Sequence, residues 1–145
     1  MSAMISTFMT EDHHYCDLLL ASFERAVSAG NWEQAVVAGE DLTAALGRHF
    51  SREEDRLFPE LLAVDPRASG PVRVMTMEHR QMRTLLADLA GAWAERDQDT
   101  CLGVVETLHF LIQQHNAKEE GILYPLADQG LASREDQVLN SLKGD

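Results

Sequence analysis

The chain has 145 residues and a formal net charge of −12, with 12 Lys and Arg against 24 Asp and Glu. That length suits a single domain, and an apolar content of 45% argues against disorder. The acidity disfavours nucleic acid and anionic membranes as partners, since both bind basic surfaces, and no apolar run is long enough to span a membrane. With no export signal at its start, the sequence predicts a cytoplasmic protein whose two cysteines are reduced thiols.

Apolar residues recur at helical spacing along the whole chain, and no strand pattern occurs. The first helix carries its apolar stripe over residues 16–27, and Gly30 and Asn31 end it. The second runs from Trp32 to Pro59, and a connection follows over residues 65–71. The third covers about 75–97 and the fourth about 102–125. Four long helices with short connections predict an all-α, up-down-up-down four-helix bundle over residues 1–129.

A tail at residues 130–145 follows the bundle. Ser133 precedes Asp136 by three residues, ahead of an apolar stretch that begins at Val138. This spacing resembles a helix N-terminus that is capped by a side chain. We expect a short fifth helix here.

An internal repeat divides the chain into two halves. Residues 49–59 read HFSREEDRLFP, and residues 115–125 read HNAKEEGILYP. The segments are 66 positions apart, and the same offset carries His13 onto His79. The chain is therefore expected to be two copies of a helical hairpin, related by an approximate twofold axis. Burial of the apolar face of each hairpin is a sufficient reason for the duplication, so the repeat alone does not require a metal.

The residues that the repeat preserves do point to a metal. A histidine and a glutamate four positions apart project from one helix face, and here that face is apolar on both the second and the fourth helix. Buried carboxylates without a cation cost several kcal/mol, and no buried Lys or Arg is evident. The predicted ligands are His13, His49, Glu53, His79, His115 and Glu119.

These six side chains are more than one tetrahedral zinc ion needs, and they suit two ions. Imidazole and carboxylate ligands are compatible with Fe, Mn, Zn or Co, and the absence of thiolate ligands argues against Cu(I) or an iron–sulfur cluster. If both glutamates bridge, each ion receives two histidines and two carboxylate oxygens. An oxo or hydroxo bridge would add a fifth ligand and leave one position open, which favours a non-haem di-iron centre over Zn or Mn.

Three neighbouring residues receive simpler interpretations. His14 maps by the offset onto an arginine, so His13 is the better ligand of the adjacent pair, and His109 is expected in solvent. Cys16 is interpreted as a small apolar core residue, with a redox role kept as the alternative.

The repeated motif contains four further residues of interest. Glu54 and Glu120 point about 100° away from the predicted ligands beside them, either into solvent or toward those ligands as supporting groups. Phe58 and Tyr124 each precede a proline and are interpreted as packing residues.

The residues quoted above resemble the hemerythrin-like (HHE cation-binding) family. The matching motifs are Asp12-His13, Glu78-His79 and the two His-x3-Glu-Glu segments that end in Leu-Phe-Pro and Leu-Tyr-Pro. The resemblance covers about residues 7–127 and is closest to a bacterial, stand-alone, single-domain branch. It implies a left-handed bundle around an oxo-bridged di-iron centre. In that arrangement His13 and His49 serve one iron, His79 and His115 serve the other, and Glu53 and Glu119 bridge them.

The sequence departs from the oxygen-carrying members of that family. Those have a further histidine four residues after the third-helix ligand, where this chain has Arg83. They also use an aspartate five residues after the fourth-helix histidine, where this chain has Glu120 and offers Glu119 one position earlier. Both departures argue against reversible O2 carriage. The four-His, two-Glu set is more similar to di-iron proteins implicated in repair of iron–sulfur centres, although the chain lacks their N-terminal Cys-containing domain.

Three functions remain in competition at this point. The favoured one is a di-iron protein that binds or reacts with O2, NO or peroxide as a sensor, scavenger or stress-response protein. The second is iron storage, delivery or sensing, including repair of iron–sulfur centres. The third is a structural module whose metal only stabilises the core. An oxygenase or oxidase is disfavoured because no substrate channel is evident, and the sequence leaves catalysis and homodimer formation open.

Overall fold

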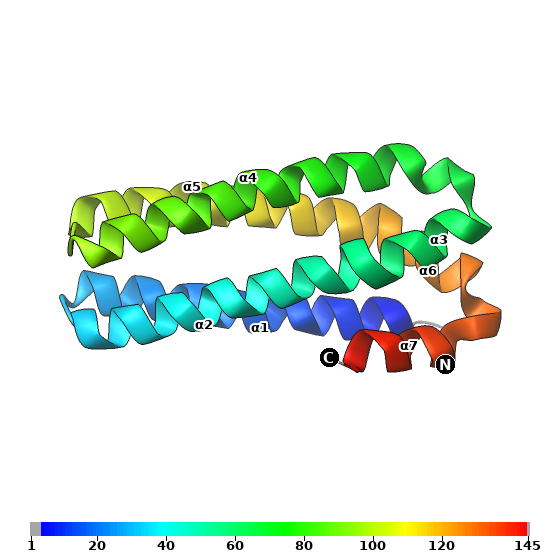
Figure 1. Ribbon diagram of the computed structural model, residues 1–145, viewed down its shortest axis with the longest axis horizontal. Helices are drawn as coiled ribbons and strands as arrows, with labels where there is room; N and C mark the ends of the chain where they lie inside the picture. Colours follow the sequence, from blue (N-terminus) through cyan, green and yellow to red (C-terminus); the bar gives the residue numbers. More distant parts are fainter. Residues whose placement is uncertain (1–3, 145) are drawn as a thin grey trace.

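The computed structural model describes residues 4–144, which form two helical hairpins packed side by side (Figure 1). In the first hairpin, α1 (Met4–Ser28) pairs with a continuous helical rod. The rod consists of α2 (Trp32–Ser51), η1 (Arg52–Leu57) and α3 (Phe58–Val64). The second repeats this plan with α4 (Ser69–Ala94), then α5 (Gln98–Lys118), η3 (Glu119–Leu123) and α6 (Tyr124–Gly130). The predicted all-α, up-down-up-down four-helix bundle is confirmed.

The tight turns inside the two hairpins follow the same 66-residue repeat as the helices. Gly30 and Arg96 both have a positive φ, of 72° and 52°. Glycine adopts this left-handed conformation freely, whereas an arginine does so at a cost. The next residues, Asn31 and Asp97, cap the following helices because their side chains accept the backbone N–H three positions on. The duplication therefore includes the turns as well as the helix faces.

The connection between the hairpins is shorter than the sequence indicated. A single 3-10 turn, η2 (Pro66–Ala68), separates α3 from α4. Helix α4 already begins at Ser69, so Pro71 lies in its first turn rather than in a loop. A proline is tolerated there because the first N–H groups of a helix have no partner within the helix.

The tail forms a 3-10 turn, η4 (Ala132–Arg134), and the expected fifth helix, α7 (Glu135–Lys143). The predicted cap is wrong, because Ser133 lies inside η4 and no side chain caps α7. Helix α7 buries Val138, Leu139 and Leu142 in the same apolar cluster as Ile5 and Met9 of α1. Figure 1 shows α7 alongside the beginning of α1, with its C-terminal end directed back along the bundle.

The interior consists of two apolar clusters with buried polar residues between them. One cluster, around Phe23, Leu42 and Leu108, fills the bundle toward the hairpin turns. The other, around Leu57 and Leu123, fills the opposite end beneath α7. Between them lie the four histidines and two glutamates of the predicted site, on the inner faces of all four rods. Within residues 4–144 no helix is long and apolar enough to cross a membrane.

Candidate metal centre

Six buried side chains converge midway along the bundle. Each of the four long helices contributes one histidine, and each π-helical turn contributes one glutamate. All six are between 0 and 3% exposed. The structure thus brings together every residue that the sequence predicted as a ligand: His13, His49, Glu53, His79, His115 and Glu119.

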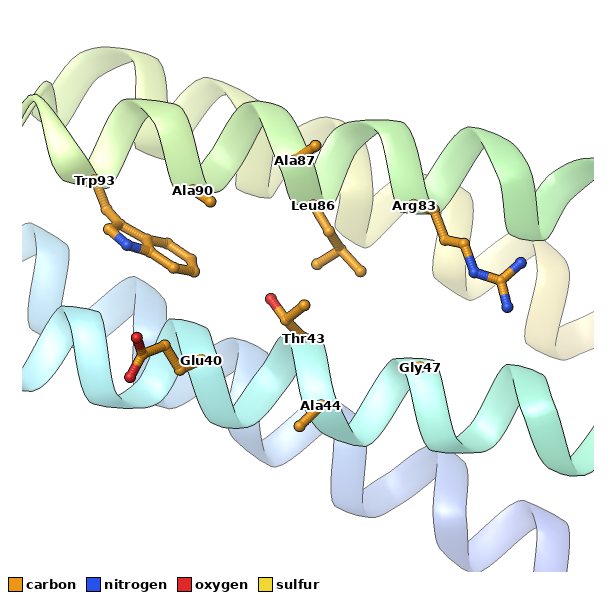
Figure 2. Close-up of a pocket in the computed structure, with 9 residues that line it drawn as sticks. All are labelled: Glu40, Thr43, Ala44, Gly47, Arg83, Leu86, Ala87, Ala90 and Trp93. Carbon is orange, nitrogen blue, oxygen red and sulfur yellow. The ribbon is translucent and has the colours of Figure 1, made fainter.

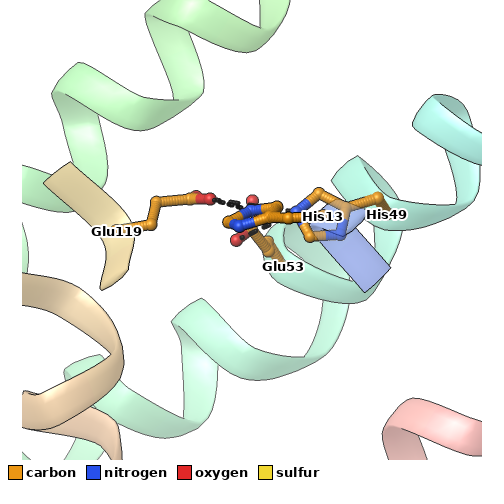
Figure 3. Close-up of side chains that lie close together, drawn as sticks. All are labelled: His13, His49, Glu53 and Glu119. Carbon is orange, nitrogen blue, oxygen red and sulfur yellow. Dashed lines mark hydrogen bonds and ion pairs between the residues drawn. The ribbon is translucent and has the colours of Figure 1, made fainter. Parts of the chain in front are cut away.

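The six residues form two overlapping groups of four, and both glutamates belong to both groups. Within each group the potential ligand atoms lie within 4.8 Å of one another. The first group adds His13 and His49, and Figure 3 shows their rings turned toward the two carboxylates. The second adds His79 and His115. Glu119 reaches both groups, with Oε1 2.9 Å from Nε2 of His13 and Oε2 3.1 Å from Nε2 of His115. This arrangement could hold two cations that share two carboxylates.

The hydrogen bonding of the second group supports a cation at that position. Nε2 of His79 lies 2.9 Å from Oε1 of Glu53, and Nε2 of His115 lies 3.1 Å from Oε2 of Glu119, but none of these four buried atoms has a partner in hydrogen-bond geometry. Leaving several buried polar atoms unsatisfied is costly, and native proteins avoid it. A cation would satisfy all four atoms at once, so the residues fit a metal.

Each histidine is held on its outer side by a carboxylate that accepts a hydrogen bond from Nδ1–H. This contact fixes the tautomer and aims Nε2 into the cluster, as in many histidine–metal sites. The four pairs are Glu120 with His13 at 2.7 Å, Asp12 with His49 at 2.8 Å, Glu54 with His79 at 2.5 Å and Glu78 with His115 at 2.8 Å.

The sequence held a signal for these supporting groups. The offset pairs Asp12 with Glu78 and Glu54 with Glu120, but their contacts run to other helices, so sequence spacing alone could not identify their partners. Of the two interpretations for Glu54 and Glu120, the supporting one holds.

Cations lie behind three of the four supporting carboxylates. Arg52 is 3.0 Å from Asp12, and Lys118, its repeat counterpart, is 2.5 Å from Glu78. Arg83 is 3.2 Å from Glu54, but the repeat counterpart of Arg83 is an aspartate. The two halves of the site are therefore similar in their ligands and different in their surrounding charge.

The two glutamates lie where each helix widens into a π turn. In η3 the backbone N–H of Tyr124 bonds to the carbonyl of Glu119, five residues earlier, and in η1 Phe58 bonds in the same way to Glu53. In an α-helix, residues five apart point about 140° away from each other. In this wider turn Glu119 and Tyr124 both face the interior, and both are 0% exposed. π turns of this kind are frequent at functional sites.

The π turn also corrects two expectations. Tyr124 was expected to be a packing residue, but its hydroxyl enters the cluster and donates a hydrogen bond to Oε2 of Glu53 at 2.6 Å. Ile122 lies seven residues after His115 and three after Glu119, so regular α-helical spacing would place it on the same buried face, but it is 52% exposed because the widened turn rotates it outward. Both deviations have the same cause, since the α-helical periodicity assumed from the sequence does not apply beyond Glu119.

The acid–base properties of the cluster reflect its mixture of imidazoles and carboxylates. Burial by itself lowers the pKa of His49, but the nearby carboxylates, Glu53 first among them, outweigh burial and raise it well above the ordinary value. Burial raises the pKa of Glu119, but the surrounding imidazoles, led by His115, bring it well below its usual range. Without a metal, protons on His49 and His115, whose pKa values are both raised, therefore balance the buried carboxylates, and a metal would have to displace them.

The interpretations of the nearby His and Cys residues are consistent with the structure. His14 and His109 are both exposed. Cys16 is buried in the apolar cluster on the hairpin-turn side, and burial raises the pKa of its thiol to about 11. A thiol that stays protonated at neutral pH is a poor nucleophile and a poor metal ligand, which supports a packing role.

Two grooves run along the sides of the bundle at positions related by the repeat. One, of about 540 Å³, lies between α2 and α4 and has Arg83 at one end and Trp93 at the other (Figure 2). The second, of about 360 Å³, lies between α1 and α5, with Asp17 where the first has Arg83. Both grooves lie outside the ligand cluster. Among the residues that line the first groove, Arg83 is the one connected to the cluster, because it pairs with Glu54, which in turn bonds to His79.

The model of one protein family matches the chain. That family is described as the hemerythrin HHE cation binding domain, and the match covers residues 4–127. This range includes both hairpins and all six residues of the cluster. No curated protein and no solved structure gives a significant match.

Proposed function

The chain belongs to the hemerythrin HHE cation-binding family, and on that premise we propose that it is a non-haem di-iron protein. In this proposal His13 and His49 hold one iron, and His79 and His115 hold the other. Glu53 and Glu119 bridge the two. The observation that carries the proposal is the pair of donor groups that overlap in both carboxylates. A carboxylate shared by two groups is the expected arrangement for a dinuclear site in a bundle core.

The donor set supports iron as the metal. Nitrogen and oxygen ligands without thiolates suit Fe, Mn, Zn and Co, and geometry and supply decide among them in cells. Two histidines and two carboxylate oxygens per ion leave room for an oxo or hydroxo bridge and for an exogenous ligand. When bound, a pair of iron ions supplies an open coordination position and electrons that small oxidants can accept.

The exogenous ligand proposed is O2, NO or peroxide, with the protein acting as a sensor, scavenger or stress-response protein. The burial of the cluster supports a ligand of this size, since all six side chains are at most 3% exposed. Reversible O2 carriage is disfavoured. Arg83, at the place where oxygen-carrying hemerythrins have a further histidine, is engaged with Glu54 instead.

Iron storage, delivery or sensing is the alternative, and it requires labile iron. The same burial argues against it, because an apolar cluster lies on each side of the ligand residues along the bundle. The measurement is retention of iron during incubation with a strong chelator. Loss of both ions within minutes would favour iron handling, and retention for hours would count against it.

The direct experiment combines metal analysis with rapid mixing. Protein purified from iron-supplemented cells is expected to contain two Fe per chain and to absorb in the near ultraviolet, as an oxo-bridged ferric pair does. The reduced protein is then mixed with O2, with NO and with peroxide in a stopped-flow spectrometer, and at least one is expected to change the metal spectrum. If none does, the small-ligand function is wrong.

A further inference from the structure

The hydroxyl of Tyr124 lies among the ligand atoms of only one of the two proposed ions. Its oxygen is 2.6 Å from Oε2 of Glu53 and 3.0 Å from Oε1 of Glu119. It is also 3.1 Å from Nε2 of His13 and 3.5 Å from Nε2 of His49. Those four atoms belong to the residues of the first group, which would hold the first ion. No comparable contact links Tyr124 to the histidines of the second group among the hydrogen bonds of residues 4–144.

Three of these four spacings match those of atoms that share one cation. Nitrogen and oxygen ligands lie about 2.0–2.2 Å from such an ion, which places neighbouring ligand atoms about 2.8–3.6 Å apart at the usual coordination angles. The distances from the Tyr124 oxygen to Glu119, His13 and His49 are 3.0, 3.1 and 3.5 Å, and the 2.6 Å contact with Glu53 is the hydrogen bond present without a metal. Nε2 of His13 and Oε1 of Glu119 are 2.9 Å apart, so the phenol oxygen fits among the other ligand atoms as a fifth member.

The second group of ligands, which contains His79 and His115, has no such oxygen nearby. The 66-residue offset pairs Tyr124, which contacts the first group, with Phe58, which lies beside His79, and both side chains are buried. The Phe58 ring lies nearly parallel to the His79 ring, with 6.3 Å between centroids, and has no atom that can bind a metal. The four atoms described above that lack hydrogen-bond geometry lie in the second group. Among the atoms that could bind a metal, the two groups therefore differ at one, the phenol oxygen.

We propose that the Tyr124 oxygen is a fifth protein ligand of the ion held by His13 and His49. This inference rests on the proposed pair of ions and makes the two inequivalent. The first ion has five protein ligands, and the second has four and keeps the more open coordination. On binding, the phenol releases its proton to solvent, and the oxygen–metal bond replaces the hydrogen bond to Glu53.

The competing role for Tyr124 is that of a hydrogen-bond donor to Glu53 that never contacts a metal. The two roles differ in the state of the phenol, which stays protonated as a donor and becomes a phenolate as a ligand. Phenol and phenolate have different ultraviolet spectra. The chain has two tyrosines, and the other one, Tyr15, is 48% exposed and serves as a matched control.

The experiment titrates Zn²⁺ into metal-free protein and follows both metal uptake and tyrosine absorption. Zn²⁺ has no absorption and no redox chemistry of its own, so the readout does not depend on iron or on O2. One phenolate per chain is expected in the wild type and in Tyr15→Phe, and none in Tyr124→Phe. Tyr124→Phe introduces the residue type that occupies the equivalent position beside His79. It is expected to lower the affinity for one of the two ions by about tenfold or more.

Each outcome has a definite meaning. Uptake of two Zn²⁺ with an unchanged tyrosine spectrum would make Tyr124 a hydrogen-bond donor only and overturn this inference while leaving the dinuclear site intact. A phenolate signal that persists in Tyr124→Phe would also overturn it. Failure of the wild type to take up any metal would overturn the proposed function and this inference together. The ferric form gives a second reading, since an iron–phenolate bond absorbs in the visible and Tyr124→Phe should lose that band.

Discussion

Asp12 offers a test of how the metal centre is supported from outside. Its Oδ2 accepts the proton of Nδ1 of His49 at 2.8 Å and a second bond from Arg52 at 3.0 Å, and the residue is only 8% exposed. The pKa of Asp12 is lowered, because His49 and Arg52 outweigh the burial that would raise it. The carboxylate is therefore charged and holds two donors at once. The perturbation is Asp12→Asn, which keeps the shape and removes the charge.

The expected cost follows from these contacts. Loss of an outer hydrogen-bond partner of a metal-binding histidine lowers metal affinity by about 10–100-fold, which is about 1.4–2.7 kcal/mol. We expect the upper part of that range, since the asparagine oxygen that would face both donors is uncharged and one of the donors is the cation Arg52. The metal-free protein should also lose about 1–3 kcal/mol of unfolding free energy, because Arg52 loses its charged partner.

The assay is stepwise Zn²⁺ binding in competition with a chelator of known affinity, with urea unfolding of the metal-free forms alongside. Glu11→Gln is the matched control, since it removes the same charge from the exposed neighbouring residue. Its affinity should stay close to that of the wild type. A wild-type affinity in Asp12→Asn would refute the reasoning, and equal losses of affinity in both variants would attribute the effect to net charge.

Three further predictions follow from the described contacts. His115→Ala removes a ligand from the second group, so metal content should drop toward one ion or none and thermal stability should fall; two ions at full occupancy would exclude His115. Gly39→Ala should cost about 1–3 kcal/mol in urea unfolding, because a Cβ there clashes with the Trp93 ring, whereas Gly47→Ala meets no atom within 4 Å and should stabilise by about 0.5–1 kcal/mol. Finally, the raised pKa values of His49 and His115 stabilise the metal-free fold below the unfolded pKa of about 6.5, and that stabilisation is lost as pH rises through the folded values. Metal binding strengthens over the same range as protons leave, so the melting temperatures of metal-free and Zn²⁺-loaded protein should diverge between about pH 6 and 9, and parallel curves would contradict this.

The repeat explains why much of the fold could be predicted from the sequence. Helical periodicity gave the four rods, and Gly30 and Asn31 marked the first turn correctly. The 66-residue offset singled out six side chains that the structure brings together. Such reasoning succeeds where one residue type repeats on one face of a regular helix. It failed at Ser133, where a local capping pattern was present but the chain formed a 3-10 turn instead.

The supporting groups and Tyr124 were beyond the reach of that reasoning for a physical reason. Asp12 supports a histidine 37 residues away, and only the packing of α1 against α2 makes that contact. Tyr124 enters the cluster because η3 is widened, and the helix propensities of the neighbouring residues do not indicate a π turn. In retrospect the proline after Phe58 and after Tyr124 was a local sign, because proline disturbs regular α-helical hydrogen bonding.

The widened turns η1 and η3 also determine how these segments can change in length. Each behaves as a single-residue insertion in an otherwise regular helix. Deleting one residue between Glu53 and Phe58 would restore ordinary helical bonding and leave the two residues four positions apart, about 40° from each other around the helix. Glu53 and Phe58 would then still face the same interior. Regular α-helix at the present length would instead turn them about 140° apart, so related sequences can keep both the carboxylate and the aromatic contact either with the widened turn or with a segment one residue shorter.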